Sequence, residues 1–278
     1  AIQMALVDLL KALGVRFHTV IGHSSGELAA AYAAGYIRPQ DAMWISYYRG
    51  VSTKFAGGRD GRRGTMLAAG LGAAEATVFI NRPSLKGRIV IGTSNSPVSV
   101  TLSGDLEAVE EARAMLEAEG KFARILKVDN AYHSFHMQAC AEPFLNSMVG
   151  AKIEILTPAE RCEWISSVYG PDRTPTPDEL AGPYWRDNML GSVLFCEGLE
   201  RAIDGSAFDV ALEIGPHPAL KASVGQTFKG KSGNGDAIPY SGVLRRGEDD
   251  VASFSEALGF LSGSTWDPKL STSTATPR

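Results

Sequence analysis

The feature that most constrains this chain is a serine set between two glycines, where an apolar segment meets a helix-forming one. The pattern Gly22-x-Ser24-x-Gly26 follows the apolar run 19–21 and precedes the alanine-rich run 28–34. Strand, tight turn and helix in this order predict a nucleophile elbow, which exposes a serine hydroxyl at the end of a strand. The sharp turn is expected to leave no room for a Cβ beside the serine, which explains the glycines. The competing interpretation is a serine that caps an ordinary helix.

The bulk composition argues against several other classes of protein. The chain has 278 residues, a hydrophobic content of 44% and a formal net charge of −4, which suits a globular core and gives no basic footprint for nucleic acid. No apolar run approaches the length of a membrane span, and no signal peptide is evident. Three widely spaced cysteines, Cys140, Cys162 and Cys196, fit neither a disulfide framework nor a zinc site. We therefore expect a soluble cytoplasmic protein that binds no metal, nucleic acid or membrane.

The order of the expected elements indicates a small unit inserted into a larger one. Residues 65–128 read as strand, helix, strand, strand, helix, strand, which is the order of a ferredoxin-like subdomain. We predict an α/β fold in which residues 1–64 and 129–262 form an α/β-hydrolase-like large subdomain around the elbow, with the ferredoxin-like subdomain beside it. Residues 184–203 are predicted to form one helix. The Ser/Thr/Pro-rich segment 263–278 is predicted to be a tail or linker.

A serine hydroxyl becomes a good nucleophile only when a base takes its proton, so the five histidines are the candidates. His18 lies just before the first expected strand and is interpreted as structural. His23 flanks the serine, but its side chain is expected to point away, so it is assigned to the pocket lining. His133 lies where the inserted unit returns the chain to the larger one, and it is the predicted base. His136 is expected at the start of the next helix, and His217 follows a strand end.

Five motifs in fixed order make the chain resemble one known family. They are Gly22-His23-Ser24-Ser25-Gly26-Glu27, Tyr47-Tyr48-Arg49-Gly50, Asn95-Ser96-Pro97-Val98-Ser99-Val100, Ala131-Tyr132-His133-Ser134 and Glu213-Ile214-Gly215-Pro216-His217-Pro218. In their order and spacing the chain is similar to the malonyl-CoA:acyl carrier protein transacylase family. Within that family it is most similar to the acyltransferase domain of iterative type I polyketide synthases of the fungal reducing kind. The resemblance covers residues 1 to about 262, and five ordered motifs are far more specific than the elbow alone.

The resemblance implies a Ser–His dyad that transfers an acyl group. Ser24 would attack a thioester carbonyl while His133 takes its proton, and the backbone N–H of Ser25 would donate to the oxyanion. A carbonyl near the loop Gly215-Pro216-His217 would orient the second ring nitrogen of the histidine. The acyl-Ser24 intermediate would then pass to the phosphopantetheine thiol of an acyl carrier protein, with no bound cofactor and no metal.

The resemblance also implies that the acyl group is malonyl. Arg49 corresponds to the arginine that pairs with the free carboxylate of malonate, since a planar guanidinium binds a carboxylate through two parallel hydrogen bonds. His23, Asn95, Asn130 and Tyr132 correspond to positions around the substrate. The bulky ring of Tyr132 would fill the space that an α-methyl group needs, which favours malonyl, whereas Asn130 departs from the family pattern.

The implied partners are an acyl carrier protein domain and neighbouring ketosynthase and other polyketide synthase domains. The family opens with a strand that ends in a Gly-Gln-Gly-type loop, whose backbone supplies a second oxyanion donor. This chain has no such stretch and begins inside an expected helix. We therefore expect a truncated N-terminus and impaired transfer activity.

Two other functions stay open at this point. A serine esterase or thioesterase of the α/β-hydrolase type shares the elbow, but it carries an Asp or Glu between the serine and a late histidine and has no need of Arg49. An inactive, truncated module that only docks a carrier protein would form no acyl adduct on Ser24.

Overall fold

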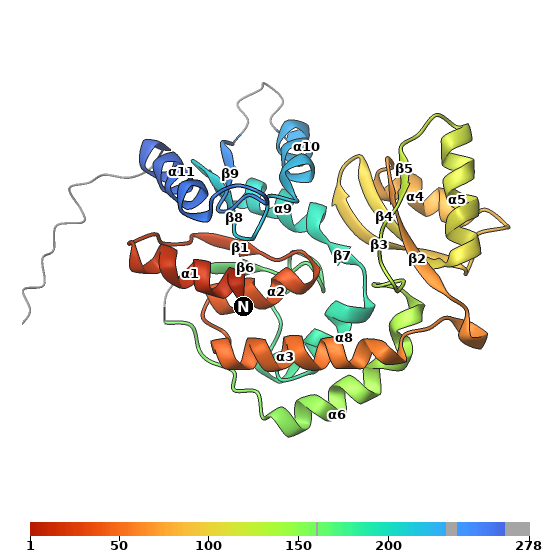
Figure 1. Cartoon of the computed structure of the whole chain (residues 1–278), viewed down its shortest axis with the longest axis horizontal. Helices are drawn as coiled ribbons and strands as arrows, with labels where there is room; N and C mark the ends of the chain where they lie inside the picture. Colours follow the sequence, from red (N-terminus) through yellow and green to blue (C-terminus); the bar gives the residue numbers. More distant parts are fainter. Residues whose placement is uncertain (160, 232–237, 265–278) are drawn as a thin grey trace, which may run out of the picture. The chain divides into compact units, whose positions relative to one another are not determined.

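The computed structural model describes residues 1–159, 161–231 and 238–264. By contacts between Cα atoms the chain divides into two compact units, each described here by itself. The larger unit is His18–Ala202, and the terminal unit combines Ala1–Phe17 with the chain from Ile203 onward (Figure 1). The boundaries differ from those of the predicted subdomains, because both ends of the chain are assigned to a different unit from the elbow. Most of the predicted tail, residues 265–278, lies outside the described residues.

The larger unit contains a five-stranded mixed sheet with helices α4 and α5 on one face (Figure 1). The sheet order is β5-β2-β4-β3-β7, and its elements are β2 (Gly64–Ala69), α4 (Ala73–Ile80), β3 (Ile89–Ser96), β4 (Ser99–Asp105), α5 (Leu106–Ala118), β5 (Ala123–Ile125) and β7 (Val193–Leu194). Strands β2 to β5 with the two helices reproduce the β-α-β-β-α-β order predicted for residues 65–128.

Side chains alternate between the two faces of the sheet, and those on one face form the core with helices α4 and α5. Leu67 of β2 pairs with Leu102 of the antiparallel strand β4, and both side chains are fully buried. Helix α5 presents Ala108, Val109, Ala112 and Leu116 to them at helical spacing. Residues one position away on β4 point to the opposite face of the sheet, which faces the candidate site described below.

A second, two-stranded sheet in the larger unit carries the elbow. Strand β1 (Thr19–Ile21) pairs in parallel with β6 (Glu163–Ile165) and leads into the 3₁₀ turn η1 (Ser24–Gly26) and helix α2 (Glu27–Ala33). Helix α3 (Pro39–Ser52) begins with proline in its first turn and packs along α6 (Ala141–Ala151) (Figure 1). The remaining short elements are η2 (Thr53–Phe55), η3 (Arg59–Gly61), η4 (Phe135–Cys140) and α7 (Pro177–Leu180).

The prediction of a single helix over residues 184–203 is wrong. Helix α8 (Pro183–Leu190) ends before Gly191, strand β7 joins the large sheet next to β3, and α9 (Phe195–Gly205) follows. Gly191 adopts an extended conformation with φ −80° and ψ 165°, and its N–H bonds to Asp187 O at 2.7 Å. The break leaves the carbonyl group of Gly191 outside the helix ladder and free to accept a hydrogen bond.

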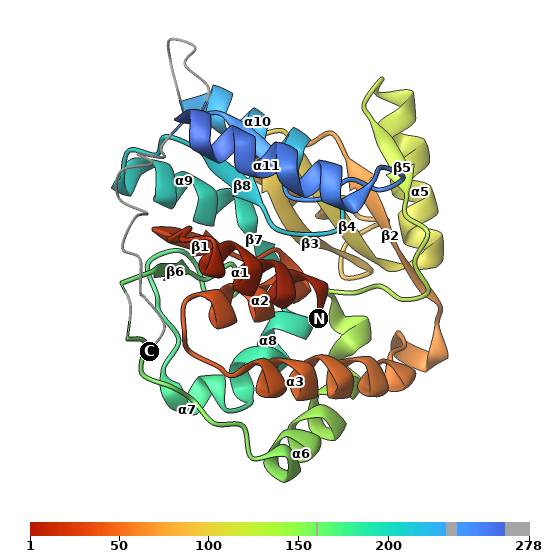
Figure 2. The same cartoon turned by 60° about the vertical axis from the view of Figure 1, so that its left-hand side comes forward.

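The terminal unit packs helices on a small parallel sheet. It contains α1 (Ile2–Ala12), β8 (Ala211–Glu213), α10 (Lys221–Lys231), β9 (Tyr240–Gly242) and α11 (Asp250–Ser264). Figure 2 shows its helices α1, α10 and α11. Its core centres on Leu6, Leu10 and Val243. Glu213 at the end of β8 accepts hydrogen bonds from the backbone N–H groups of Ala219 and Leu220, just before α10. None of the described helices combines the length and the apolar character needed to cross a membrane.

Candidate active site

The elbow holds its serine in a backbone conformation that residues with a Cβ seldom adopt. Ser24 has φ 53°, in the left-handed region, which costs on the order of 1–3 kcal/mol for a residue other than glycine. A Cβ on Gly22 would overlap the backbone of Glu27, so the turn requires glycine there. The expectation for Gly26 is wrong, because a Cβ there would enter open space. The elbow therefore depends on one of its two glycines.

The structure brings Ser24 and His133 together although they are 109 residues apart. Oγ of Ser24 lies 2.7 Å from Nε2 of His133, and Nδ1 of the same ring lies 2.9 Å from the carbonyl oxygen of Gly191. A carbonyl can only accept, so Nδ1 carries the proton and Nε2 is the lone-pair nitrogen that accepts from the serine hydroxyl. The loop Gly215-Pro216-His217, expected to orient the ring, belongs to the terminal unit, and Gly191 supplies the carbonyl instead.

The surroundings keep this histidine neutral. Burial, followed by the positive charge of Arg49, lowers the pKa of His133 to about 3. Desolvation disfavours the imidazolium form, and a neighbouring cation disfavours it further. The ring is therefore in the basic form across the physiological range of pH.

Arg49 and Asn188 complete the surroundings of the serine. Nη2 of Arg49 donates to Oγ of Ser24 at 3.3 Å, and Nη1 donates to Oδ1 of Asn188. Nδ2 of Asn188 in turn donates to the carbonyl oxygen of Ser24 at 3.0 Å. Burial lowers the pKa of Arg49 to about 10, so the guanidinium stays charged at neutral pH. Both hydrogen bonds from Arg49 go to neutral oxygens, which leaves its positive charge available to an anionic group beside the serine.

Asn188 is a site residue that sequence reasoning missed. Its position lay inside the helix predicted for 184–203, where no motif singled it out. It is 3% exposed between the buried residues Trp185 and Met189 of α8. A polar residue on an otherwise apolar helix face was the available signal, because buried amides need partners.

The other predicted residues of the pocket differ in their contacts and in their exposure. Nε2 of His23 lies 2.8 Å from Oδ1 of Asn95, the His23 ring packs edge-on against Phe195, and burial lowers the pKa of His23. This arrangement agrees with a lining role and not with a second base. Asn130 and Tyr132 are half-buried in the segment that leads to His133, and the side chain of Ser25 is exposed at the start of η1.

A buried carboxyl group anchors the elbow from behind. Glu27 is fully buried, and its oxygens receive hydrogen bonds from Trp164 Nε1 at 2.7 Å, Tyr184 Oη at 2.9 Å and Ser167 N at 2.9 Å. The hydroxyl of Ser167 lies 2.7 Å from Glu27 and 2.8 Å from the carbonyl oxygen of Gly22. Burial raises the pKa of Glu27. This cluster ties the start of α2 to the segment that follows β6, and only the glutamate of the elbow motif points to it in the sequence.

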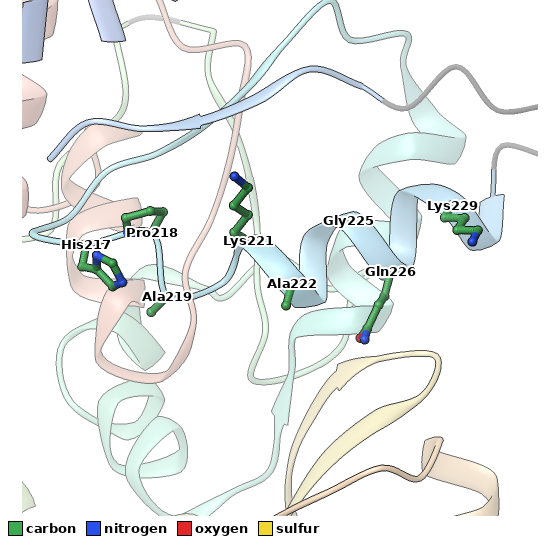
Figure 3. A pocket seen from close by; sticks show the side chains of 8 residues that line it. All are labelled: His217, Pro218, Ala219, Lys221, Ala222, Gly225, Gln226 and Lys229. Atoms are coloured by element: carbon green, nitrogen blue, oxygen red, sulfur yellow. The ribbon is translucent and has the colours of Figure 1, made fainter. Parts of the chain in front are cut away.

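His217 lines a separate pocket within the terminal unit. The pocket has a volume of about 660 Å³ and opens beside α10, with His217, Lys221, Gln226 and Lys229 among its side chains (Figure 3). Nδ1 of His217 accepts a hydrogen bond from the backbone N–H of Arg246 at 3.4 Å. Across the described part of the chain, no three His, Cys, Asp or Glu side chains gather in a way that could hold a metal ion.

Comparison with known proteins gives consistent matches. The family described as acyl transferase domain matches residues 1–264. The chain is 50% identical over 262 residues to the polyketide synthase-nonribosomal peptide synthetase hybrid himA of Aspergillus japonicus, covering 94% of this chain and 6% of that protein. It is 47% identical to the reducing polyketide synthase grgA of a Penicillium species, covering 94% of this chain and 11% of that protein. The chain thus spans a small fraction of the length of these relatives.

A solved structure matches the fold as well. The acyltransferase domain from module 8 of the salinomycin polyketide synthase superposes with a TM-score of 0.82 at 29% identity, over 92% of this chain and 57% of that one. The mixed α/β fold is therefore the one found in acyltransferase domains of polyketide synthases.

Proposed function

Because this chain belongs to the acyl transferase domain family, we propose that it transfers malonyl units from malonyl-CoA to the phosphopantetheine arm of an acyl carrier protein during polyketide synthesis. The proposal rests on one observation above others. A serine on a strained elbow has a neutral imidazole 2.7 Å from its oxygen and a half-buried guanidinium 3.3 Å from the same atom. The imidazole suits proton transfer, and the guanidinium suits an acyl group that ends in a carboxylate.

The first half-reaction follows from the geometry of the dyad. Nε2 of His133 takes the proton of Ser24 as Oγ forms a bond to the thioester carbon, and the carbonyl π electrons move onto its oxygen. The N–H of Ser25, at the start of η1, is the proposed donor to that oxyanion. When the carbonyl re-forms, the carbon–sulfur bond breaks and His133 gives its proton to the departing thiolate of CoA. Malonyl-Ser24 remains.

The second half-reaction runs the same steps in reverse with a different thiol. His133 takes the proton of the phosphopantetheine thiol, and the sulfur attacks the ester carbon of malonyl-Ser24. The carbon–oxygen bond breaks, and His133 returns the proton to Oγ of Ser24. The mechanism is ping-pong, because CoA leaves before the carrier protein binds.

Arg49 is the proposed specificity determinant. Its guanidinium is half-buried and donates to neutral oxygens, so an incoming carboxylate would gain a charge-assisted, two-point hydrogen bond without having to displace a protein carboxylate. Tyr132, together with His23, Asn95 and Asn130, is proposed to line the space around the malonyl carbon chain. An esterase of the α/β-hydrolase type has no use for an arginine beside its serine.

We also propose that an α/β-hydrolase-like large subdomain carries a ferredoxin-like insert. The sheet order β5-β2-β4-β3 with α4 and α5 on one face supports a ferredoxin-like insert, and the elbow supports an α/β-hydrolase-like large subdomain. We propose a cytoplasmic polyketide synthase with a ketosynthase and a carrier protein as neighbours, by analogy with the relatives above.

A two-stage mass measurement tests the function. The protein is first incubated with malonyl-CoA, and then with a carrier protein bearing phosphopantetheine; Ser24→Ala and Ser147→Ala are treated in parallel. We expect a malonyl adduct on the wild type and on Ser147→Ala, none on Ser24→Ala, and transfer of the adduct to the carrier. Release of free malonate without transfer would identify a hydrolase. The absence of any adduct would support a docking module and overturn the proposal.

A further inference from the structure

The backbone conformation of His133, in the loop 131–134, is unfavourable and needs a physical cause. This residue has φ 58°, in the left-handed region that residues with a Cβ rarely adopt. Such a conformation persists only where the surrounding structure holds the backbone on both sides. Nothing in the dyad does this, because the contacts of the ring with Ser24 and Gly191 act on the side chain. The restraint must therefore come from elsewhere in the larger unit.

One flank of His133 is held by a hydroxyl of the central strand β4. Oγ of Ser103 donates to the carbonyl oxygen of Tyr132, the residue directly before the histidine, at 2.6 Å. The side chain of Ser103 is completely buried. Beside it, a Cβ on Gly92 of β3 would come within 3.0 Å of the Ser103 Cβ and 3.5 Å of the His133 Cβ. The glycine, at an irregular point of the β3–β4 register, gives the loop room to approach the sheet.

The other flank is held by a carboxylate from the same strand. Oδ1 of Asp105 lies 2.8 Å from Nε2 of His136, and both residues are buried. The backbone N–H of His136 donates to Oγ of Ser134, and that hydroxyl donates to the carbonyl oxygen of Ala131 at 2.6 Å. This chain of contacts closes the loop across the histidine. The second oxygen of Asp105 lies 3.4 Å from Nη1 of Arg62.

Both anchors lie on one face of β4. Ser103 and Asp105 are two residues apart, so their side chains point to the same side of the strand. Val100 and Leu102 of the same strand point the other way, into the core beneath α4 and α5. A Cβ on Gly58 or on Gly64 would overlap the ring of His136, so the backbone is shaped around that ring as well.

We propose that Ser103 and Asp105, the latter through His136, are positioning residues that clamp the strained loop carrying the base, so that the inserted sheet forms part of the catalytic apparatus. The inference rests on the proposed function in that it takes His133 as the base. The alternative is that these contacts only provide hydrogen-bond partners for buried polar groups. In that case the position of the His133 ring does not depend on them.

The hydrogen bonds from Ser103 to Tyr132 and between Asp105 and His136 are called the clamp below. Removing either of them should change the kinetics of malonyl loading. The hydrogen bonds of Ser103 and Asp105 go to Tyr132 and His136, and neither goes to Arg49, the proposed carboxylate ligand. Removing them should therefore lower kcat for loading by more than it raises KM for malonyl-CoA, since Tyr132 also lines the proposed pocket. A displaced ring would also become hydrated. Burial is the first cause of the lowered pKa of His133, ahead of the two groups that face the ring, Arg49 and His23. Its pKa should therefore rise toward the ordinary value, and loading should gain an acidic limb.

The experiment compares Ser103→Ala and Asp105→Ala with two controls. Asp105→Asn keeps an oxygen that can accept from His136, and Ser147→Ala removes a similar hydroxyl-to-carbonyl bond of 2.8 Å within α6. We expect Ser103→Ala and Asp105→Ala to lose about 10- to 100-fold in the loading rate, a loss of up to about 3 kcal/mol in transition-state stabilisation. Asp105→Asn and Ser147→Ala should stay within about threefold of the wild type. If Asp105→Ala does not fold, Ser103→Ala and Asp105→Asn decide.

A second readout does not require malonyl transfer. Histidine ring signals in ¹⁵N NMR should show that His133 does not titrate between pH 5 and 8 in the wild type and does so in Ser103→Ala. Absence of loading in the wild type would count against the proposed function, and the NMR titration would still decide on the clamp. Loading by Ser103→Ala at the wild-type rate, an increase in KM alone, or an unchanged titration of His133 would overturn the inference.

Discussion

Both proposed reacting residues have backbone conformations that are unfavourable for residues with a Cβ. Ser24 and His133 have φ values of 53° and 58°, although each carries a Cβ. Strain of this kind survives where neighbouring contacts over-determine the backbone, and it is concentrated at functional sites. At Ser24 the hydrogen bond from Asn188 supplies one such contact, and at His133 the strand β4 supplies others. The hydroxyl and the imidazole are therefore held in place before any substrate arrives.

The role of Arg49 gives the sharpest prediction at this scale. Arg49→Ala should lower kcat/KM for malonyl-CoA by about 10²–10³-fold, or about 2.7–4 kcal/mol, because it removes the charge-assisted contact with the terminal carboxylate. Loading from acetyl-CoA, which lacks that carboxylate, should change by less than about tenfold. Steady-state kinetics with the two thioesters measure the difference. An equal loss with both would show that the arginine serves the serine and not the acyl group.

The neutral state of His133 predicts an unusual pH profile. Its pKa of about 3 lies well below the ordinary value of about 6.5 for a free imidazole, so the basic form is present throughout the range above pH 5. The rate of malonyl loading should therefore stay flat from pH 7 down to pH 5, where an exposed histidine would already have lost most of its activity. Rapid-quench loading over that range is the measurement. Half-loss near pH 6.5 would contradict it.

At the scale of elements, the elbow depends on how closely helix α2 approaches the end of strand β1. Gly22 lies against the backbone of Glu27, and the carboxyl group of Glu27 is bound by Trp164, Tyr184 and Ser167. The start of the helix is thus tied down on the side away from Ser24. This arrangement separates the tasks of the two glycines, which look equivalent in the sequence pattern.

The two glycines form a matched pair for mutation. Gly22→Ala should abolish loading, with a loss of at least about 100-fold, because its Cβ would overlap the backbone of Glu27 and displace the elbow. Gly26→Ala should load at close to the wild-type rate, since its Cβ enters open space and its φ of −62° suits alanine. Intact-mass loading assays with circular dichroism compare them. Similar behaviour of the two variants would show that the close approach is not what the turn requires.

The sequence pattern predicted the elements that have clear periodicity. It did not predict those that depend on an interruption of a helix, such as the end of α8 before Gly191. The order of strands and helices over residues 65–128 followed from alternating and helical spacing. The functional carbonyl of Gly191 and the amide of Asn188 were missed because Tyr184 to Ile203 has a continuous helical composition. The extended backbone of Gly191 and the pairing of β7 with β3 show that the helix stops at Leu190. Long-range strand pairing is not visible in local periodicity, and the expectation for the loop 215–217 came from the family resemblance alone.

At the scale of the whole molecule, the proposed site lies entirely within the unit His18–Ala202. Ser24 and Arg49 precede the five-stranded sheet in the chain, His133 follows its main strands, and Asn188 and Gly191 come just before β7. Residues far apart in sequence therefore meet only when this unit is folded, and the packing of its sheet is a condition of activity.

The core of that sheet should determine the stability of the unit. Leu116→Ala removes a fully buried side chain of α5 and should cost about 2–5 kcal/mol. For a chain of this size each kcal/mol lowers the melting temperature by roughly 2–4 °C. Loading at low temperature should stay close to wild type, because Leu116 faces away from the clamp. Calorimetry with a loading assay checks both parts, and a loss of loading without loss of stability would contradict the account.

Peptide mass spectrometry after a brief exposure to malonyl-CoA maps the acyl adduct and so tests Ser24 as the nucleophile. We expect a malonyl group on Ser24 in the wild type, no adduct in Ser24→Ala, and strongly slowed formation in His133→Ala. A malonyl group on any other residue, or an undiminished adduct in Ser24→Ala, would contradict it.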